Sequence, residues 1–146
     1  MGIGKENYHK FPALLRAKLE NGDILFPEET KFEYESIVGY RSILRETGDE
    51  TPVNRNDMRS YAELGKIRVG ALTKPALEKM PIYYGISFFT SLDKMKQGYK
   101  MGSPKQRLAV GRIYMEGGPE LTKDSHVTWW LYESVSFESF KFYEEN

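Results

Sequence analysis

The segment YYGISFFTSLDKMKQGY, residues 83–99, joins two kinds of secondary structure. Its first half is rich in aromatic and β-branched residues, which favours a buried strand over residues 82–90. Ser91 follows this strand, and serine is a residue type that often begins a helix. The next residues, LDKMKQ, have the spacing of a short amphipathic helix that Gly98 can end. The segment therefore predicts a strand that leads directly into a helix.

The size and composition of the chain limit the kinds of protein it can be. A length of 146 residues is close to the usual size of one domain, so we expect a single domain over residues 1–146. The absence of cysteine excludes disulfides, thiolate metal ligands and a cysteine nucleophile. No apolar run is long enough to span a membrane, so we expect no contact with one. The lack of disulfides also fits a cytoplasmic location.

The charge of the chain is balanced overall but uneven along its length. Lys and Arg number 21, and so do Asp and Glu. A neutral chain is a poor binder of double-stranded nucleic acid, where charge neutralisation supplies most of the affinity. Between Lys94 and Arg112, however, there are six basic residues and no acidic one. This basic run is either a solvated face or an anion site suited to one phosphate group.

The N-terminal part of the chain contains an ambiguous turn at Asn21-Gly22. Asn-Gly between two apolar runs favours a β-hairpin, because both central residues of its turn need positive φ. The alternative is a short helix that begins after Pro12 and ends at Asn21-Gly22. Further on, Pro27 and the acidic residues behind it predict the start of another helix.

The rest of the chain divides into a helical middle and a strand-rich end. Capping residues and stop signals predict helices over 54–66 and 73–81. Apolar and alternating patterns predict strands over 36–44, 106–115 and 126–134, with a final segment, 136–144, of uncertain register. This order predicts an α+β fold: a twisted, mostly antiparallel sheet with short helices inserted in the middle of the chain. Trp129 and Trp130 point to opposite faces of their strand, so we expect one in the core and the other near the surface.

Several common catalytic and metal-binding patterns are absent from the sequence. Only two histidines exist, His9 and His126, so a histidine metal cluster is not expected and we assign no metal ligands. No glycine-rich phosphate loop of the standard length follows a strand, and no serine lies in a nucleophile elbow. His126 beside Ser125 is not by itself a catalytic triad.

Three segments in chain order suggest a functional site. They are Tyr40-Arg41 on the early strand, the segment 83–99, and the late strand that ends in LYES with Glu133. In this order and spacing, residues 36–133 weakly resemble the ADP-ribosyltransferase-like fold. Members often have a Tyr-Arg pair on an early strand, a strand of the G-I-x-F-x-T-S kind that leads into a helix, and a glutamate on a late strand.

The resemblance implies a nucleotide site, with NAD as the possible cofactor. Arg41 and Glu133 would be the catalytic residues: Arg41 would hold a phosphate or ribose, and Glu133 would stabilise positive charge on the sugar. The implied cofactor-binding residues are Tyr84, Gly85, Ser87, Thr90, Ser91 and Tyr99. The sequence departs from the family in two places. The Gln/Glu-x-Glu pattern is missing around Glu133, and Phe88 and Phe89 interrupt the Ser-Thr-Ser triplet, so the site is active or degenerate.

Two other classes of function fit the sequence. The first is a protein-binding module that uses an exposed aromatic patch, because aromatic residues with a polar rim are typical of interfaces. The second is a single-stranded nucleic-acid binder, in which Tyr99 and Tyr114 stack on bases beside the basic run. The partner is therefore a small nucleotide, a protein or a single strand, and the sequence alone leaves open whether the protein is an enzyme and whether it forms oligomers.

Overall fold

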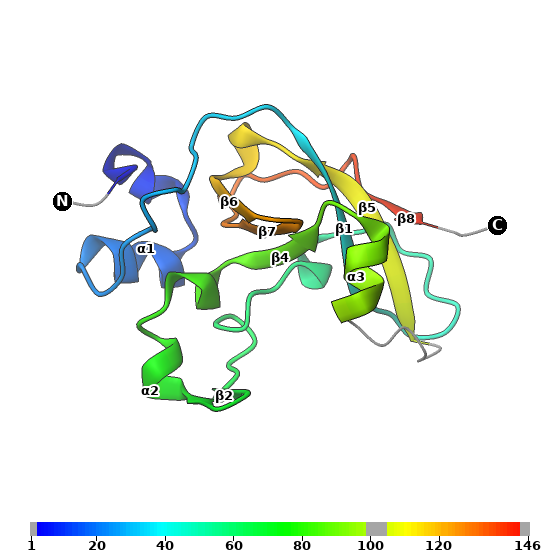
Figure 1. Cartoon of the computed structure of the whole chain (residues 1–146), viewed down its shortest axis with the longest axis horizontal. Coiled ribbons are helices and arrows are strands. Elements are labelled where there is room, and N and C mark those ends of the chain that lie inside the picture. Colours follow the sequence, from blue (N-terminus) through cyan, green and yellow to red (C-terminus); the bar gives the residue numbers. More distant parts are fainter. Residues whose placement is uncertain (1–2, 99–104, 144–146) are drawn as a thin grey trace.

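A six-stranded sheet with strand order β6-β7-β4-β1-β5-β8 forms the centre of the molecule (Figure 1). The structure, a computed structural model, describes residues 3–98 and 105–143. All pairings in the sheet are antiparallel. The strands are β1 (Ile37–Leu44), β4 (Ile86–Phe89), β5 (Gln106–Ile113), β6 (Glu120–Lys123), β7 (His126–Trp129) and β8 (Lys141–Tyr143), with a separate hairpin of β2 (Arg68–Val69) and β3 (Leu72–Thr73). The predicted α+β fold with a mostly antiparallel sheet is confirmed.

Short helices connect the strands. The α-helices are α1 (Ala13–Glu20), α2 (Lys74–Leu77) and α3 (Leu92–Gly98), and the 3-10 helices are η1 (Lys5–Lys10), η2 (Arg55–Asp57), η3 (Pro81–Tyr84) and η4 (Met115–Gly117). As predicted, α3 follows β4 directly, and it contacts β4 and β1. The Ser91 hydroxyl accepts a hydrogen bond from the backbone N–H of Lys94 at 3.4 Å, which caps the first turn of α3.

The hairpin expected at Asn21-Gly22 is wrong, and the alternative helix forms instead. Asn21 has φ of −80° and follows α1, while Gly22 has φ of 75°. Because the expected hairpin turn needs positive φ at both residues, Asn21-Gly22 serves as the C-terminal cap of α1. Leu15 and Leu19, one turn apart on α1, are buried in the core.

The strand predicted over 82–90 begins only at β4, because residues 81–84 form η3, and the helix predicted over 73–81 is limited to α2. Two other helix predictions are wrong. Residues 54–66 form only the three-residue turn η2 and an irregular segment. Asn54 and Asp57 do cap each other, but both Asp57 carboxylate oxygens also accept hydrogen bonds from Arg45, at 2.8 and 2.7 Å. This long-range pairing holds the turn where a longer helix was expected. After Pro27 the chain makes a turn, with the Thr30 N–H bonded to the Pro27 carbonyl, rather than a helix.

One face of the sheet is filled by aromatic side chains and is called the closed face. It carries Ile86, Phe88, Val127 and Trp129, which are all at most 2% exposed. Gly39 on β1 lies opposite Gly111 on β5, and both glycines leave room for rings. A Cβ at Gly111 would lie 2.3 Å from the ring of Phe140, so only glycine permits this packing.

The N-terminal segment builds a second buried cluster against the end of the sheet. Trp130 packs edge-on against Phe26, with ring centroids 5.0 Å apart, and its indole N–H donates to the Pro81 carbonyl at 2.9 Å. Trp129 donates in the same way to the Gly118 carbonyl. Both tryptophans are 0% exposed, so the expectation that one lies near the surface is wrong.

Candidate functional site

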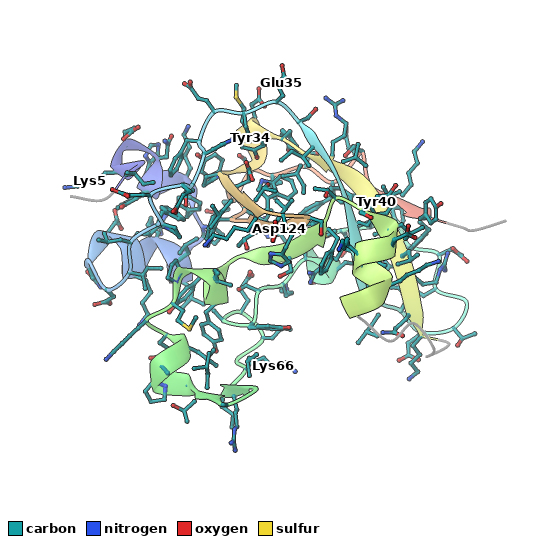
Figure 2. The ribbon with its side chains drawn as sticks, in the orientation of Figure 1. Lys5, Tyr34, Glu35, Tyr40, Lys66 and Asp124 are labelled. Atoms are coloured by element: carbon teal, nitrogen blue, oxygen red, sulfur yellow. The ribbon has the colours of Figure 1, made fainter. Side chains whose placement is uncertain are left out.

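The face opposite the closed face presents one side chain from each strand at the same level of the sheet. In sheet order these residues are Lys123, His126, Phe89, Tyr40, Val110 and Lys141, and they are called the open row. The four central members are half-buried, and the two lysines at the ends are exposed. In Figure 2, Tyr40 on β1 and Asp124 in the β6–β7 turn mark the region in which the row lies. The open row thus combines aromatic surface in the middle with a cation at each end.

Ser87 and His126 form a polar pair beside the open row. Ser87 lies on β4 two residues before Phe89, so its side chain shares the face of the row. Its Oγ is 3.1 Å from His126 Nε2, a hydrogen-bonding distance. The ring of Phe89 packs edge-on against the imidazole, with centroids 5.4 Å apart. Burial lowers the pKa of His126, so the imidazole is neutral at neutral pH, and its tautomer decides whether Nε2 or the serine hydroxyl donates.

Arg41 joins β1 to β4 at the level of this pair. The paired residues of the β1–β4 ladder are Tyr40 and Phe89 alone. Next to them, Arg41 Nη1 donates to the Ser87 carbonyl at 3.0 Å, and Arg41 Nε donates to the Asp57 carbonyl at 3.3 Å. The guanidinium lies over the Phe88 ring on the closed face, 5.9 Å from its centroid. Arg41 is therefore fixed in the junction between the two strands and reaches Ser87 through its main chain.

A buried ion pair holds η2 under this junction. Arg45 is the residue that follows β1. It binds Asp57 through two parallel hydrogen bonds, and both side chains are 6% exposed. Arg45 also donates to the Thr51 and Pro52 carbonyls, so it binds the main chain of the loop that leads to η2. Its hydrogen bonds to Asp57 raise the pKa of Arg45 further. The ion pair holds η2 in place, so that the Asp57 carbonyl accepts the hydrogen bond from Arg41 Nε.

The predicted cofactor residues on and after β4 have separate environments. Thr90 is exposed and its hydroxyl donates to the Ser125 carbonyl at 3.4 Å, while Ser91 caps α3. Gly85 is packed closely, because a Cβ there would lie 2.4 Å from Thr128 Cγ2. Tyr84 is buried in the N-terminal cluster, its hydroxyl donates to the Glu78 carbonyl, and burial raises its pKa to about 12. Tyr99 lies outside the described residues.

Glu133 lies past the end of β7, away from Ser87. It is exposed, and its backbone N–H donates to the Lys10 carbonyl at 2.8 Å. The adjacent Tyr132 carbonyl accepts a hydrogen bond from Arg55 of η2 at 3.3 Å. Glu133 and Arg41 therefore both lie next to η2. The late-strand residues beside Ser87 are His126, which is hydrogen-bonded to its hydroxyl, and Thr128, its partner in the β4–β7 ladder.

Two hollows in the surface lie near the N-terminal segment. The first, beside Tyr84 and Arg55, has a cavity volume of about 20 Å³, which is room for a single water molecule. The second is a groove of about 650 Å³ between η1 and α1, and none of the predicted site residues lines it. None of the residues of the open row lines either of these two hollows.

Sequence reasoning did not single out Tyr40, Phe89 and His126 as neighbours. The alternation in β4 does place Ser87 and Phe89 on one face, and that signal was readable. Which residues of the other strands lie opposite them depends on the register between strands, which no local pattern supplies. The register brings His126 to Ser87 from 39 positions away.

No family model matches the chain, and no curated protein or solved structure matches it at a significant level. Within residues 3–98 and 105–143, no group of three or more His, Asp or Glu side chains is arranged to hold a metal ion. Over the same residues, every helix is too short or too polar to cross a bilayer.

Proposed function

We propose that this protein binds a nucleotide of the NAD type at the open row. The observation that supports the proposal is the adjacency of β7, β4 and β1 in the sheet. In the resemblance to the ADP-ribosyltransferase-like fold, β1 carries Tyr40-Arg41 and β4 lies within the segment 83–99, whereas Glu133 follows β7 beyond its end. The three strands are distant in the sequence, yet Arg41, Ser87 and His126 are linked by hydrogen bonds across them.

The side chains of the open row suit the parts of such a ligand. Phe89 and Tyr40 are half-buried and neighbouring, which offers ring faces or edges to a base. The Ser87–His126 pair can exchange its internal hydrogen bond for bonds to ribose hydroxyls. Lys123 at the end of the row supplies a positive charge for a pyrophosphate.

ADP-ribosyl transfer would need a carboxylate near the sugar. Cleavage of the nicotinamide–ribose bond builds positive charge on the ribose, which a fixed negative charge stabilises. His126 is neutral at neutral pH and supplies no such charge. Glu133 remains the candidate carboxylate, and it lies beyond the end of β7. We therefore propose binding as the primary activity, with transfer dependent on Glu133.

Isothermal titration with NAD and ADP-ribose tests the binding proposal. We expect Phe89→Leu to weaken binding about tenfold, because it removes the ring but keeps an apolar side chain. Leu44→Ser is the matched control: Leu44 lies on β1, on the face of Tyr40, and is 72% exposed. Equal affinity of the wild type and Phe89→Leu, or no heat of binding with either ligand, would contradict the proposal.

Nicotinamide release from NAD separates binding from chemistry. If Glu133 acts on the ribose, Glu133→Gln abolishes the release and leaves the dissociation constant for NAD unchanged. If the wild type binds NAD and releases no nicotinamide, the site is a binding site without transfer. Release that persists in Glu133→Gln would exclude Glu133 as the catalytic carboxylate.

A further inference from the structure

Residues 58–82, between β1 and β4, form a projecting lobe that contains β2, β3 and α2. In Figure 1 the lobe extends away from the sheet, on the side opposite the connection that leads into β1. It is fixed to the body by hydrogen bonds that involve η3. The Tyr83 hydroxyl donates to the Lys66 carbonyl, the Tyr84 hydroxyl donates to the Glu78 carbonyl at 3.0 Å, and the Ala62 N–H donates to the Tyr83 carbonyl at 3.2 Å. The lobe is therefore an ordered feature with defined surfaces.

The lobe exposes an unusual amount of apolar side chain. Among the described residues, six of the twelve exposed large hydrophobic side chains lie in this stretch of 25 residues. They are Tyr61 (46% exposed), Leu64 (55%), Ile67 (68%), Leu72 (37%), Met80 (38%) and Ile82 (47%). Single exposed apolar residues are ordinary, whereas a concentration on one projecting element is typical of an interaction site.

Hydrogen bonds bring several of these apolar residues to one edge of the lobe. The bond from Ala62 to the Tyr83 carbonyl sets the chain at Tyr61 beside the chain at Ile82. The bond from Tyr83 to the Lys66 carbonyl sets Ile67 beside the same helix, η3. The exposed side chains therefore come from segments that lie next to one another.

The charges of the lobe select the kind of partner. It contains five basic residues and two acidic ones, Glu63 and Glu78. The two acids form ion pairs with Arg59 and Lys74 at one helical turn of spacing. Among the described residues, Lys66, Arg68 and Lys79 have no ion pair. An acidic partner complements this surface, whereas a second lobe would place like charges against each other.

We propose that the projecting lobe docks a protein partner that presents an apolar centre and an acidic rim. A stable protein interface uses about 20–30 residues on each side, with an apolar core surrounded by polar groups. The six exposed apolar side chains of the lobe supply such a core, and Lys66, Arg68 and Lys79 supply charges for its rim. This surface is separate from the open row, so the docking proposal stands whether or not the protein binds a nucleotide.

Selection from a random peptide library displayed on phage tests the proposal with a defined probe. We expect enriched peptides to combine large apolar residues with Asp and Glu, and to bind more weakly as salt rises. In the purified protein, Leu64→Ser with Ile67→Ser should weaken the selected peptides at least about tenfold. These residues are already in solvent, so the folded state should tolerate the changes. Leu44→Ser, at a site of similar exposure on β1, should leave binding unchanged.

Charge reversal distinguishes the acidic partner from other occupants. Lys66→Glu with Lys79→Glu should abolish binding of the acidic peptides and favour basic ones. Enriched peptides without acidic residues, or peptides that bind the variants and the wild type equally, would overturn the proposal. Wild-type binding to vesicles of anionic lipid, or to a single-stranded oligonucleotide, that is lost on this charge reversal would overturn it in favour of a membrane or a nucleic acid.

Discussion

The two faces of β4 and β7 differ although the residues that form them alternate along the same strands. On the closed face, Ile86, Phe88, Val127 and Trp129 are at most 2% exposed. On the other face, Ser87, Phe89 and His126 remain half-buried. Along β4, every second residue is therefore buried in the core, and the residues between them stay half-buried on the face of the open row. The strand pattern alone does not separate these roles, because aromatic residues occur on both faces.

The difference also appears in the polar groups of the two faces. The indole N–H of Trp129 has an internal partner, the Gly118 carbonyl at 3.1 Å, and needs nothing from solvent. The Ser87–His126 pair is a hydrogen bond between two side chains that keep some access to solvent. Groups of the second kind can change partners when a ligand arrives, whereas groups of the first kind are fixed by packing.

The largest predicted effect is on the closed face, where Trp129→Ala should lower the free energy of unfolding by about 3–5 kcal/mol. Trp129 is 0% exposed, and its ring packs near those of Phe88, Tyr114 and Phe140. Truncation leaves a cavity that these rings cannot refill. Urea unfolding measures the change, and Phe89→Ala on the other face is the comparison. A loss for Phe89→Ala as large as that for Trp129→Ala would show that the two faces do not differ in this way.

The next largest effect is expected when a methyl group is added on the closed face. Gly111→Ala places a methyl group 2.3 Å from a ring atom of buried Phe140, so the ring or the strand must move. We expect a loss of about 1–3 kcal/mol in the free energy of unfolding. Gly22→Ala is a control for close packing, because a Cβ at Gly22 meets nothing within 4 Å and only its positive φ opposes the change. Thermal or urea unfolding that leaves Gly111→Ala as stable as the wild type would contradict the packing around Phe140.

Elements set by local patterns were predictable from the sequence. The strand at β1, the strand at β5 and the passage from β4 through Ser91 into α3 follow from alternation, β-branched residues and a cap. Where a distant residue decides the outcome, the local pattern failed. Arg45 holds Asp57 in a short turn where a helix was expected over 54–66, and Phe26 of the N-terminal segment covers Trp130.

The candidate site was predictable only in part, for the same reason. Arg41 and Ser87 were chosen from the sequence, and they are hydrogen-bonded through the Ser87 carbonyl. Glu133 was the late-strand residue predicted for the site, but it lies beyond the end of β7, and His126 at the start of that strand is hydrogen-bonded to Ser87. A shift of two residues in strand register would change that partner, and register depends on the whole sheet.

A smaller effect is predicted for the polar pair. Ser87→Ala removes the hydrogen bond to His126 Nε2, and we expect a loss of about 0.5–1.5 kcal/mol in the free energy of unfolding. Because Ser87 is half-buried, water can partly replace the hydroxyl. Thr90→Ala is the matched control, since the Thr90 hydroxyl bonds to Ser125, the residue before His126, but Thr90 is exposed. A change above the range expected for Trp129→Ala would indicate that Ser87 belongs to the core.

The smallest predicted effect is a dependence of stability on pH that originates at His126. Burial lowers the folded-state pKa of His126 below its unfolded value of about 6.5. Between these two values the unfolded chain binds more protons than the folded one, so stability rises with pH. The contribution is complete above the unfolded pKa, falls as the pH drops below about 6.5, and levels off below the folded pKa.

Unfolding free energies of the wild type and His126→Asn across this range test the assignment. The stability of the wild type relative to His126→Asn should decrease as the pH falls below about 6.5. Only the wild type has an imidazole that is buried when folded and takes up a proton more readily when unfolded. A constant difference between wild type and His126→Asn at every pH would mean that His126 is solvated, and the open row would then extend to the protein surface at that end.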